Sequence, residues 1–117
     1  MILRMIAATL VVGLGALGAY VAAQPAERVI RITTKKFAFS PDHLTLKKGE
    51  PVIFEFVADD VVMGWNLTEF RLRADIVPGK ATRMRFVANR TGEFTFFCDI
   101  FCGTGHEDMA GSINVVD

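Results

Sequence analysis

The sequence predicts a small all-β protein, a sandwich or barrel of seven to eight short strands, and two observations lead to it. Short runs rich in valine, isoleucine, threonine and phenylalanine recur between residues 28 and 116, and these residue types favour β-strands. Residues that favour turns separate the runs at regular intervals, and no run in this region has the apolar spacing of a helix. This pattern is typical of a small antiparallel sandwich or barrel.

Two strands are expected first, of which the earlier is long and continues to Pro41. Residues 28–34 are rich in β-branched side chains, residues 37–40 continue extended as far as a turn at Pro41, and residues 44–46 form a brief alternating strand. The polar residues that follow predict a turn, in which Gly49 can adopt a positive φ angle.

Residues 52–57 give the clearest strand prediction of the chain. Their mostly apolar side chains indicate a central, well-buried strand. Further along, apolar residues alternate with arginines, as on strands with one exposed face, and most phenylalanines fall on strands, where we expect them in the core. The remaining strands are expected at residues 61–67, 70–73, 82–87, 93–97 and 112–116, with turns at residues 77–80 and 89–92.

The first residues of the chain have a different character. Residues 5–23 contain no charged side chain, Arg4 precedes them, and they end in small alanines. A basic start, an apolar run and small residues at a cleavage point are typical of a secretory signal peptide, and the run is also about as long as a minimal membrane span. Residues 1–23 are therefore predicted to be either a cleaved signal or a single-span membrane anchor. Both alternatives place residues 24–117 as one domain in the periplasm or at the outer face of the cytoplasmic membrane.

Composition and charge argue against several classes of function. The formal net charge is zero, which does not indicate a general nucleic-acid or anionic-surface binder. The sequence contains no glycine motif that cradles phosphate and no evident set of nucleophile, base and acid. A small barrel packed with phenylalanine also leaves little interior room for a substrate, so the chain is not expected to be an enzyme by itself.

Four potential metal ligands lie close together near the end of the sequence. Cys98, Cys102, His106 and Met109 follow the spacing Cys-x3-Cys-x3-His-x2-Met. They fall between two predicted strands and would therefore share one loop at one end of the β structure. Thiolate, imidazole and thioether are the soft donors that select copper over hard cations.

Two alternatives to copper remain open for these residues. Outside the cytoplasm Cys98 and Cys102 could form a disulfide, but it would close a very short loop, for which the chain-entropy stabilisation is small. A disulfide would also leave His106 and Met109 unexplained. Zinc is chemically possible with two cysteines and one histidine, although a nearby methionine favours copper. The spacing therefore favours a metal over a disulfide, and copper over zinc.

These residues and their spacing resemble the cupredoxin family, and more narrowly the CuA domain of cytochrome c oxidase subunit II and of nitrous oxide reductase. The resemblance covers residues 28–117. It implies a Greek-key β-sandwich that binds one or two copper ions. By the same resemblance, Cys98 and Cys102 bridge two coppers, His106 and Met109 each bind one of them, and Ile100, midway between the cysteines, contributes its backbone carbonyl.

One position departs from the family pattern. The family's other histidine lies in an earlier segment that reads Asp-Val-x-His-x-Phe, and this chain has Met63 at that place, within the segment DVVMGW of residues 60–65. No nearby histidine can replace it, since His43 is expected to be a solvated surface residue. A thioether favours Cu(I) where an imidazole is a good donor to Cu(II). Three outcomes remain open: Met63 binds a copper pair with a raised reduction potential, a single copper is held by the loop ligands and a methionine, or Met63 is core packing.

Two further predictions concern the surroundings of the loop. Asp99, Glu107 and Asp108 are expected to form a solvated acidic rim, or alternatively a docking surface for a basic redox partner. Trp65 is expected to be a half-buried structural residue, or else a cap of the site or an exposed entry point for electrons.

The resemblance implies electron transfer as the first function, with a c-type cytochrome and a terminal oxidase or reductase as partners, and the chain as a subunit of an oxidase-like complex. The second hypothesis is a periplasmic carrier or store of Cu(I) that passes copper to an acceptor protein, and the extra methionine favours it. The third is a disulfide-stapled β domain without metal, against which the intact His106 and Met109 count. Reversible cycling of bound copper in place, as opposed to ready transfer to an acceptor, distinguishes the first two.

Overall fold

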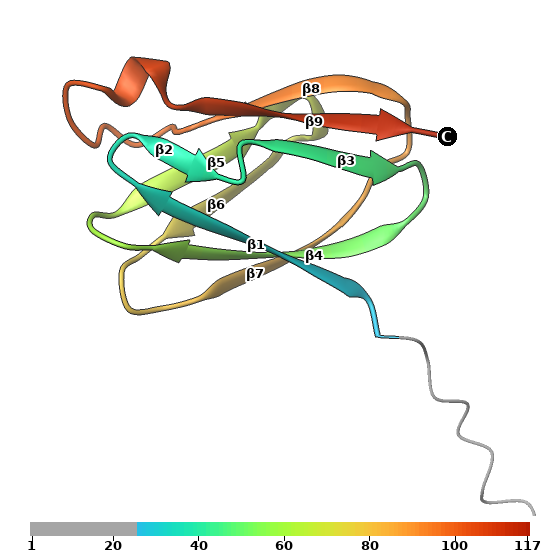
Figure 1. Ribbon diagram of the computed structural model, residues 1–117, viewed down its shortest axis with the longest axis horizontal. Coiled ribbons are helices and arrows are strands. Elements are labelled where there is room, and N and C mark those ends of the chain that lie inside the picture. Colours follow the sequence, from blue (N-terminus) through green and yellow to red (C-terminus); the bar gives the residue numbers. More distant parts are fainter. Residues whose placement is uncertain (1–25) are drawn as a thin grey trace, which may run out of the picture.

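The computed structural model describes residues 26–117, which fold into two β-sheets around one core (Figure 1). Within these residues there are nine strands and two short 3₁₀ turns. The strands are β1 (Arg28–Lys35), β2 (Ala38–Ser40), β3 (His43–Lys47), β4 (Pro51–Ala58), β5 (Met63–Leu67), β6 (Leu72–Ile76), β7 (Thr82–Val87), β8 (Gly92–Phe97) and β9 (Ala110–Val116). The 3₁₀ turns are η1 (Thr68–Phe70) and η2 (His106–Asp108).

The predicted signal peptide or anchor helix, residues 1–23, lies outside the described residues. In residues 26–117 no helix has the length and apolar character needed to cross a membrane.

The two sheets have mixed strand directions. One sheet contains four strands in the order β2-β1-β4-β7, and the other contains five in the order β3-β9-β8-β5-β6. The prediction of an all-β sandwich is confirmed. An antiparallel sandwich was expected, and two of its strand pairs are instead parallel, β1 with β4 and β3 with β9. Alternating apolar residues determine which face of a strand is buried and carry no information about its direction, so the sequence pattern could not reveal these two pairs.

Several strand boundaries differ from the prediction: β5 begins at Met63 rather than at residue 61, β9 begins at Ala110 rather than at residue 112, and two differences change the element itself. The segment before Pro41 is a separate strand, β2, which folds back antiparallel on β1 and raises the count from the predicted seven or eight to nine. Phe70, predicted on a strand, lies in η1, and Arg71 follows with a left-handed φ of 55°, so that β6 begins at Leu72. The predicted turn at Gly49 is confirmed, with a φ of 82°.

The core is an aromatic cluster between the sheets. The indole of Trp65 on β5 lies 5.4 Å from the ring of Phe54 and 5.0 Å from that of Phe56, both on β4, and 5.6 Å from that of Phe96 on β8. Trp65 has no exposed surface, so it is a fully buried core residue and neither a half-buried residue nor a surface entry point. The central position and burial predicted for β4 are confirmed, since it lies between β1 and β7.

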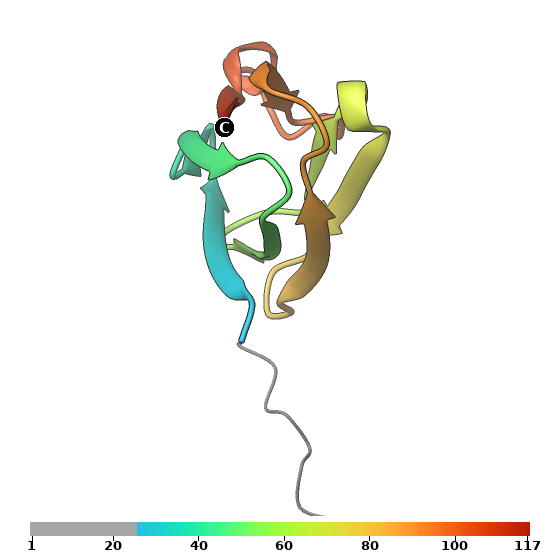
Figure 2. The same ribbon diagram turned by 90° about the vertical axis from the view of Figure 1, so that its right-hand side faces the viewer.

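Strand order brings the predicted ligand segments to one end of the sandwich. Met63 is the first residue of β5, and Phe97 is the last residue of the antiparallel neighbour β8. The start of β5 and the loop after β8 therefore meet at the same end, which is the end opposite the C-terminus in Figure 1. Figure 2 shows the strands of both sheets arranged around one interior, seen from the end at which the C-terminus lies, so that this loop is on the far side.

Candidate metal centre

Three of the predicted ligands converge in the structure. The donor atoms of Cys98, Cys102 and His106 all lie within 4.8 Å of one another. The two Sγ atoms are 3.9 Å apart, and Cys102 Sγ is 3.7 Å from His106 Nδ1. Both cysteines are free thiols, because the distance between their Sγ atoms is well beyond the ~2.05 Å of a disulfide bond. Because a metal–thiolate bond is about 2.3 Å long, one ion can contact both sulfurs at this separation.

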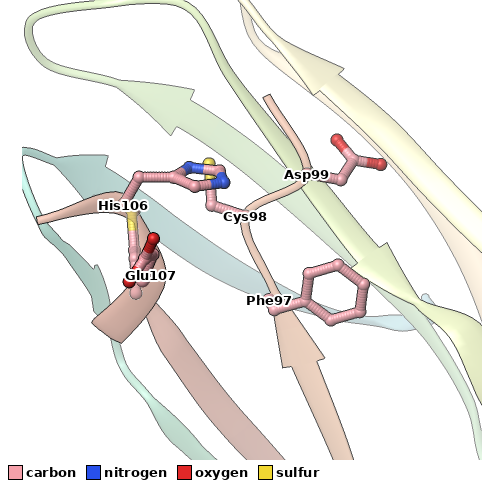
Figure 3. Close-up of a pocket in the computed structure, with 6 residues that line it drawn as sticks. Phe97, Cys98, Asp99, His106 and Glu107 are labelled. Atoms are coloured by element: carbon pink, nitrogen blue, oxygen red, sulfur yellow. The ribbon is translucent and has the colours of Figure 1, made fainter. Parts of the chain in front are cut away.

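The local fold explains why residues far apart in the loop come together. The alternation of β8 points Phe94, Phe96 and then Cys98 into the core. The Cys98 amide donates a hydrogen bond to the carbonyl of Met109 at 3.1 Å, which closes the base of the loop. Within the loop, the amide of Met109 donates a hydrogen bond to the carbonyl of His106 at 3.2 Å and so closes the turn η2. In Figure 3 the imidazole of His106 accordingly reaches across to the sulfur of Cys98.

The carbonyl of Ile100 lies beside this cluster, and two methionines with predicted roles are buried in the core. The Cys98 thiol donates to the Ile100 carbonyl oxygen at 3.2 Å, so this oxygen faces the sulfur that would bind the metal. Met63 and Met109 are fully buried and belong to the same core cluster as Cys98. The soft donors fit copper, and the roles of the carbonyl and the two thioethers as ligands stay predictions.

Burial affects the chemistry of the second cysteine. Desolvation raises the pKa of the Cys102 thiol, and the neighbouring Cys98 adds to this increase. Two thiols this close cannot both ionise easily without a cation between them, which is the environment that a metal ion would complete.

The acidic residues around the loop do not behave alike. Glu107 and Asp108 are exposed on η2, as expected of a solvated rim. Asp99 is not part of that rim, because Arg73 holds it in an ion pair and its side chain is only 17% exposed. The hydrogen bond from Arg73 is the main reason that the pKa of Asp99 lies below its usual value. Figure 3 shows its carboxylate directed away from His106.

A surface hollow of about 470 Å³ lies at the loop. Its lining includes two of the clustered donors, Cys98 and His106, together with Met109 and Glu107 (Figure 3). The hollow therefore opens beside the candidate metal site. His43, in contrast, is exposed on β3 and bonds through Nδ1 to Ser112 Oγ at 2.7 Å, which confirms its expected place on the surface.

Sequence reasoning missed two residues that support the loop. The ring of Phe37, from the turn between β1 and β2, covers Gly103 and Gly105, where any added Cβ atom would overlap it. Arg73 holds Asp99 from β6. Neither contact can be predicted from neighbouring residues in the sequence. The two glycines between Cys102 and His106 indicate only that some other group could pack closely on this stretch, and not which one.

Comparison with known proteins agrees with this geometry. The chain matches the cupredoxin-like domain family over residues 5–115. It is 26% identical over 91 residues to cytochrome c oxidase subunit 2 of Thermus thermophilus, which covers 78% of this chain and 67% of that protein. It is 35% identical over 72 residues to alternative cytochrome c oxidase subunit 2 of Bradyrhizobium diazoefficiens, which covers 62% of this chain. The match spans only 26% of the length of that second relative.

Two solved structures share the fold of this chain. The periplasmic domain of subunit II of cytochrome oxidase from Bradyrhizobium japonicum superposes with a TM-score of 0.72 at 21% identity, covering 80% of this chain and 87% of that one. The metal-binding domain of the Cu(I)-exporting P-type ATPase of Streptococcus pneumoniae gives a TM-score of 0.62 at 25% identity, covering 76% and 85%. The chain belongs to the cupredoxin-like family, and within it is related to the CuA domain of cytochrome c oxidase subunit II.

Proposed function

We propose that the chain is an electron-transfer domain that binds copper and passes single electrons between a c-type cytochrome and a terminal oxidase or reductase. The observation that carries this proposal is the convergence of two thiols and one imidazole within 4.8 Å on one loop. Relatedness to oxidase subunit II supports it. The same relatedness supports a location in the periplasm or at the outer face of the cytoplasmic membrane, with the chain as a non-catalytic part of an oxidase-like complex.

The residues of the loop have distinct tasks in this proposal. Cys98, Cys102 and His106 hold the copper, the thioether of Met109 and the carbonyl of Ile100 complete its surroundings, and Met63 supplies a further thioether. Copper, when bound, supplies a couple that accepts and releases one electron at a time. The buried, close-packed base of the site keeps the donors in place, so little reorganisation accompanies each change of oxidation state.

The surface around the loop suits a brief contact with a protein partner. Phe37, which covers the loop glycines, and Val62, which precedes Met63, are exposed, and Phe101 on the loop is 78% exposed. Its ring lies 5.7 Å from that of His106, which places an apolar contact point next to a metal ligand. Glu107 and Asp108 beside it would steer a basic partner towards this end.

A second candidate function is carriage or storage of Cu(I). Met63 favours it, because a thioether prefers Cu(I) to Cu(II). The likeness to a metal-binding domain of a Cu(I)-exporting ATPase supports it as well. Under this hypothesis, the copper passes to an acceptor protein whose own soft ligands replace those of the loop.

Copper content and electron paramagnetic resonance of the full chain test both candidates. Two coppers that share one unpaired electron, seen as a seven-line hyperfine pattern, are expected for the electron-transfer centre. One copper, or silent Cu(I) that a chelator removes quickly, would favour carriage. A reduced chain that binds no copper would contradict both.

A further inference from the structure

Asp99 lies between two of the predicted copper ligands and is held by side chains from two neighbouring strands. Arg73 on β6 donates through Nε to Asp99 Oδ2 and through Nη2 to Oδ1, each at 2.8 Å. Asn66 on β5 donates through Nδ2 to Oδ2 at 3.0 Å. Paired hydrogen bonds from an arginine to a carboxylate fix the direction of both groups, as well as their distance.

Gly64 leaves room for this arrangement. A Cβ atom added at Gly64 would overlap Asp99 Oδ1 and would lie 3.0 Å from Arg73 Nη2. The carboxylate therefore occupies the space that any side chain on Gly64 would fill. Gly64 directly follows Met63, so the carboxylate rests on the part of β5 that leads out of the candidate metal site. We call Asp99, Arg73, Asn66 and Gly64 together the Asp99 clamp.

We propose that Asp99 is a positioning residue of the metal centre, and that the Asp99 clamp fixes the Cys98 thiol and the Ile100 carbonyl relative to Met63 on β5. The inference rests on the proposed function, since it takes these groups as copper ligands. The backbone bond between Cys98 and Met109 secures the base of the loop, but it does not tie the loop to β5. Asp99 supplies that attachment, because it is covalently joined to Cys98 and Ile100 and bonded to β5 and β6.

Two substitutions in the full chain remove the clamp in different ways. Arg73→Gln removes the paired hydrogen bonds, and Gly64→Ala displaces the carboxylate while every charge is retained. Arg85→Gln is the matched control, because Arg85 forms a comparable ion pair with Glu27 at 2.9 Å on the other sheet.

The first readout needs no copper. Hydrogen exchange of the Cys98 amide, which the bond to Met109 protects, reports on local opening of the loop base. We expect this amide to exchange about tenfold faster in both clamp variants than in wild type. Loss of a charge-assisted hydrogen bond typically shifts an equilibrium such as the opening of the loop by about a factor of ten. The control and the amides of β4 should exchange as in wild type. After copper loading, both clamp variants should also change the absorption spectrum in the same direction.

Three results would overturn the inference. The first is a Cys98 amide that exchanges at the wild-type rate in both clamp variants. The second is an equal increase in Cys98 exchange in the control Arg85→Gln. The third is a spectral change in Arg73→Gln that is absent in Gly64→Ala, which would indicate an effect of charge alone. If Gly64→Ala does not fold, Arg73→Gln decides the matter, because its side chain is 45% exposed and its removal leaves the core intact. Absence of copper binding in wild type would contradict the proposed function independently of the exchange result.

Discussion

Replacing Met63 by leucine separates its packing from its sulfur. Met63 is fully buried at the start of β5, and leucine has a similar volume but no donor atom. Such a swap in a core typically costs less than about 1.5 kcal/mol, so the free energy of unfolding of the copper-free chain should change little. If the thioether binds copper, Met63→Leu should weaken copper binding at least tenfold, since even residues that only support a metal ligand contribute about 10–100-fold.

Met84→Leu is the matched control for this variant. Met84 lies on β7, is partly buried and packs against the same core, but no prediction places it at the metal. The assay is competition with a Cu(I) chelator, combined with urea unfolding with and without copper. Equal copper retention and equal spectra in Met63→Leu and Met84→Leu would refute the role of Met63 as a ligand.

Met63→His tests the same position from the other side. Without copper, a buried imidazole lacking a partner should lower the free energy of unfolding by about 1–3 kcal/mol. With copper at a hundred times its dissociation constant, binding should restore about 2.7 kcal/mol. Because imidazole is the better donor to Cu(II), the reduction potential should fall and the spectrum should move towards that of a CuA centre. A spectrum unchanged from wild type would contradict ligation.

Three further predictions concern the scaffold. Hydrogen bonds from Arg31 and then Arg83 lower the pKa of Glu55, so its ionised form stabilises the fold above its ordinary pKa and this contribution is lost as the pH falls through the lowered value. Urea midpoints should therefore fall more steeply on acidification in wild type than in Glu55→Gln, and parallel curves would contradict this. Phe37→Ala should speed copper loss to a chelator while lowering the free energy of unfolding by less than the ~3–5 kcal/mol typical of a buried phenylalanine, because the ring is 36% exposed. The Nε1 of Trp65 has no hydrogen-bond partner among residues 26–117, so Trp65→Phe should cost only the packing that the smaller ring loses. The loss in free energy of unfolding in denaturant titrations should therefore stay below the ~3–5 kcal/mol typical of Trp→Ala, and a loss in that range or above it would contradict this.

The sequence predicted those parts of the fold that depend on neighbouring residues. The apolar run that became β4 and the glycine turn at Gly49 are local patterns, and both are confirmed. The ligand spacing was also local, because Cys98, Cys102 and His106 lie on one loop and need only that loop to close. Strand direction in the pairs β1–β4 and β3–β9 depends on the path of the chain between sheets, and no local pattern records that path.

The contacts that support the loop could not be predicted from the sequence, for the same reason. Asp99 looked like a solvated acid because charged residues in loops usually are, but its partners Arg73 and Asn66 lie 26 and 33 positions earlier in the chain. Trp65 was expected to be half-buried, and the structure buries it completely because phenylalanines from β4 and β8 close around it. Which charge meets which partner, and which ring meets which, is determined by tertiary packing rather than by position in the sequence.

These supports also bear on the choice between electron transfer and copper carriage. A carrier must let an acceptor's ligands reach the ion and must release its own donors within the encounter, which requires a loop that opens readily. Here the loop is attached at three places: the Cys98–Met109 backbone bond at its base, Asp99 on β5 and β6, and the ring of Phe37 over its glycines. Each attachment lowers the population of open conformers and favours donors that hold one arrangement in both oxidation states. Of the three clustered donors, Cys98 is buried and Cys102 and His106 are partly accessible, so the ligands of an acceptor would not readily reach the Cys98 sulfur. The loop architecture therefore supports the proposed electron transfer more than carriage, and in that proposal the thioether of Met63 would raise the reduction potential of the centre.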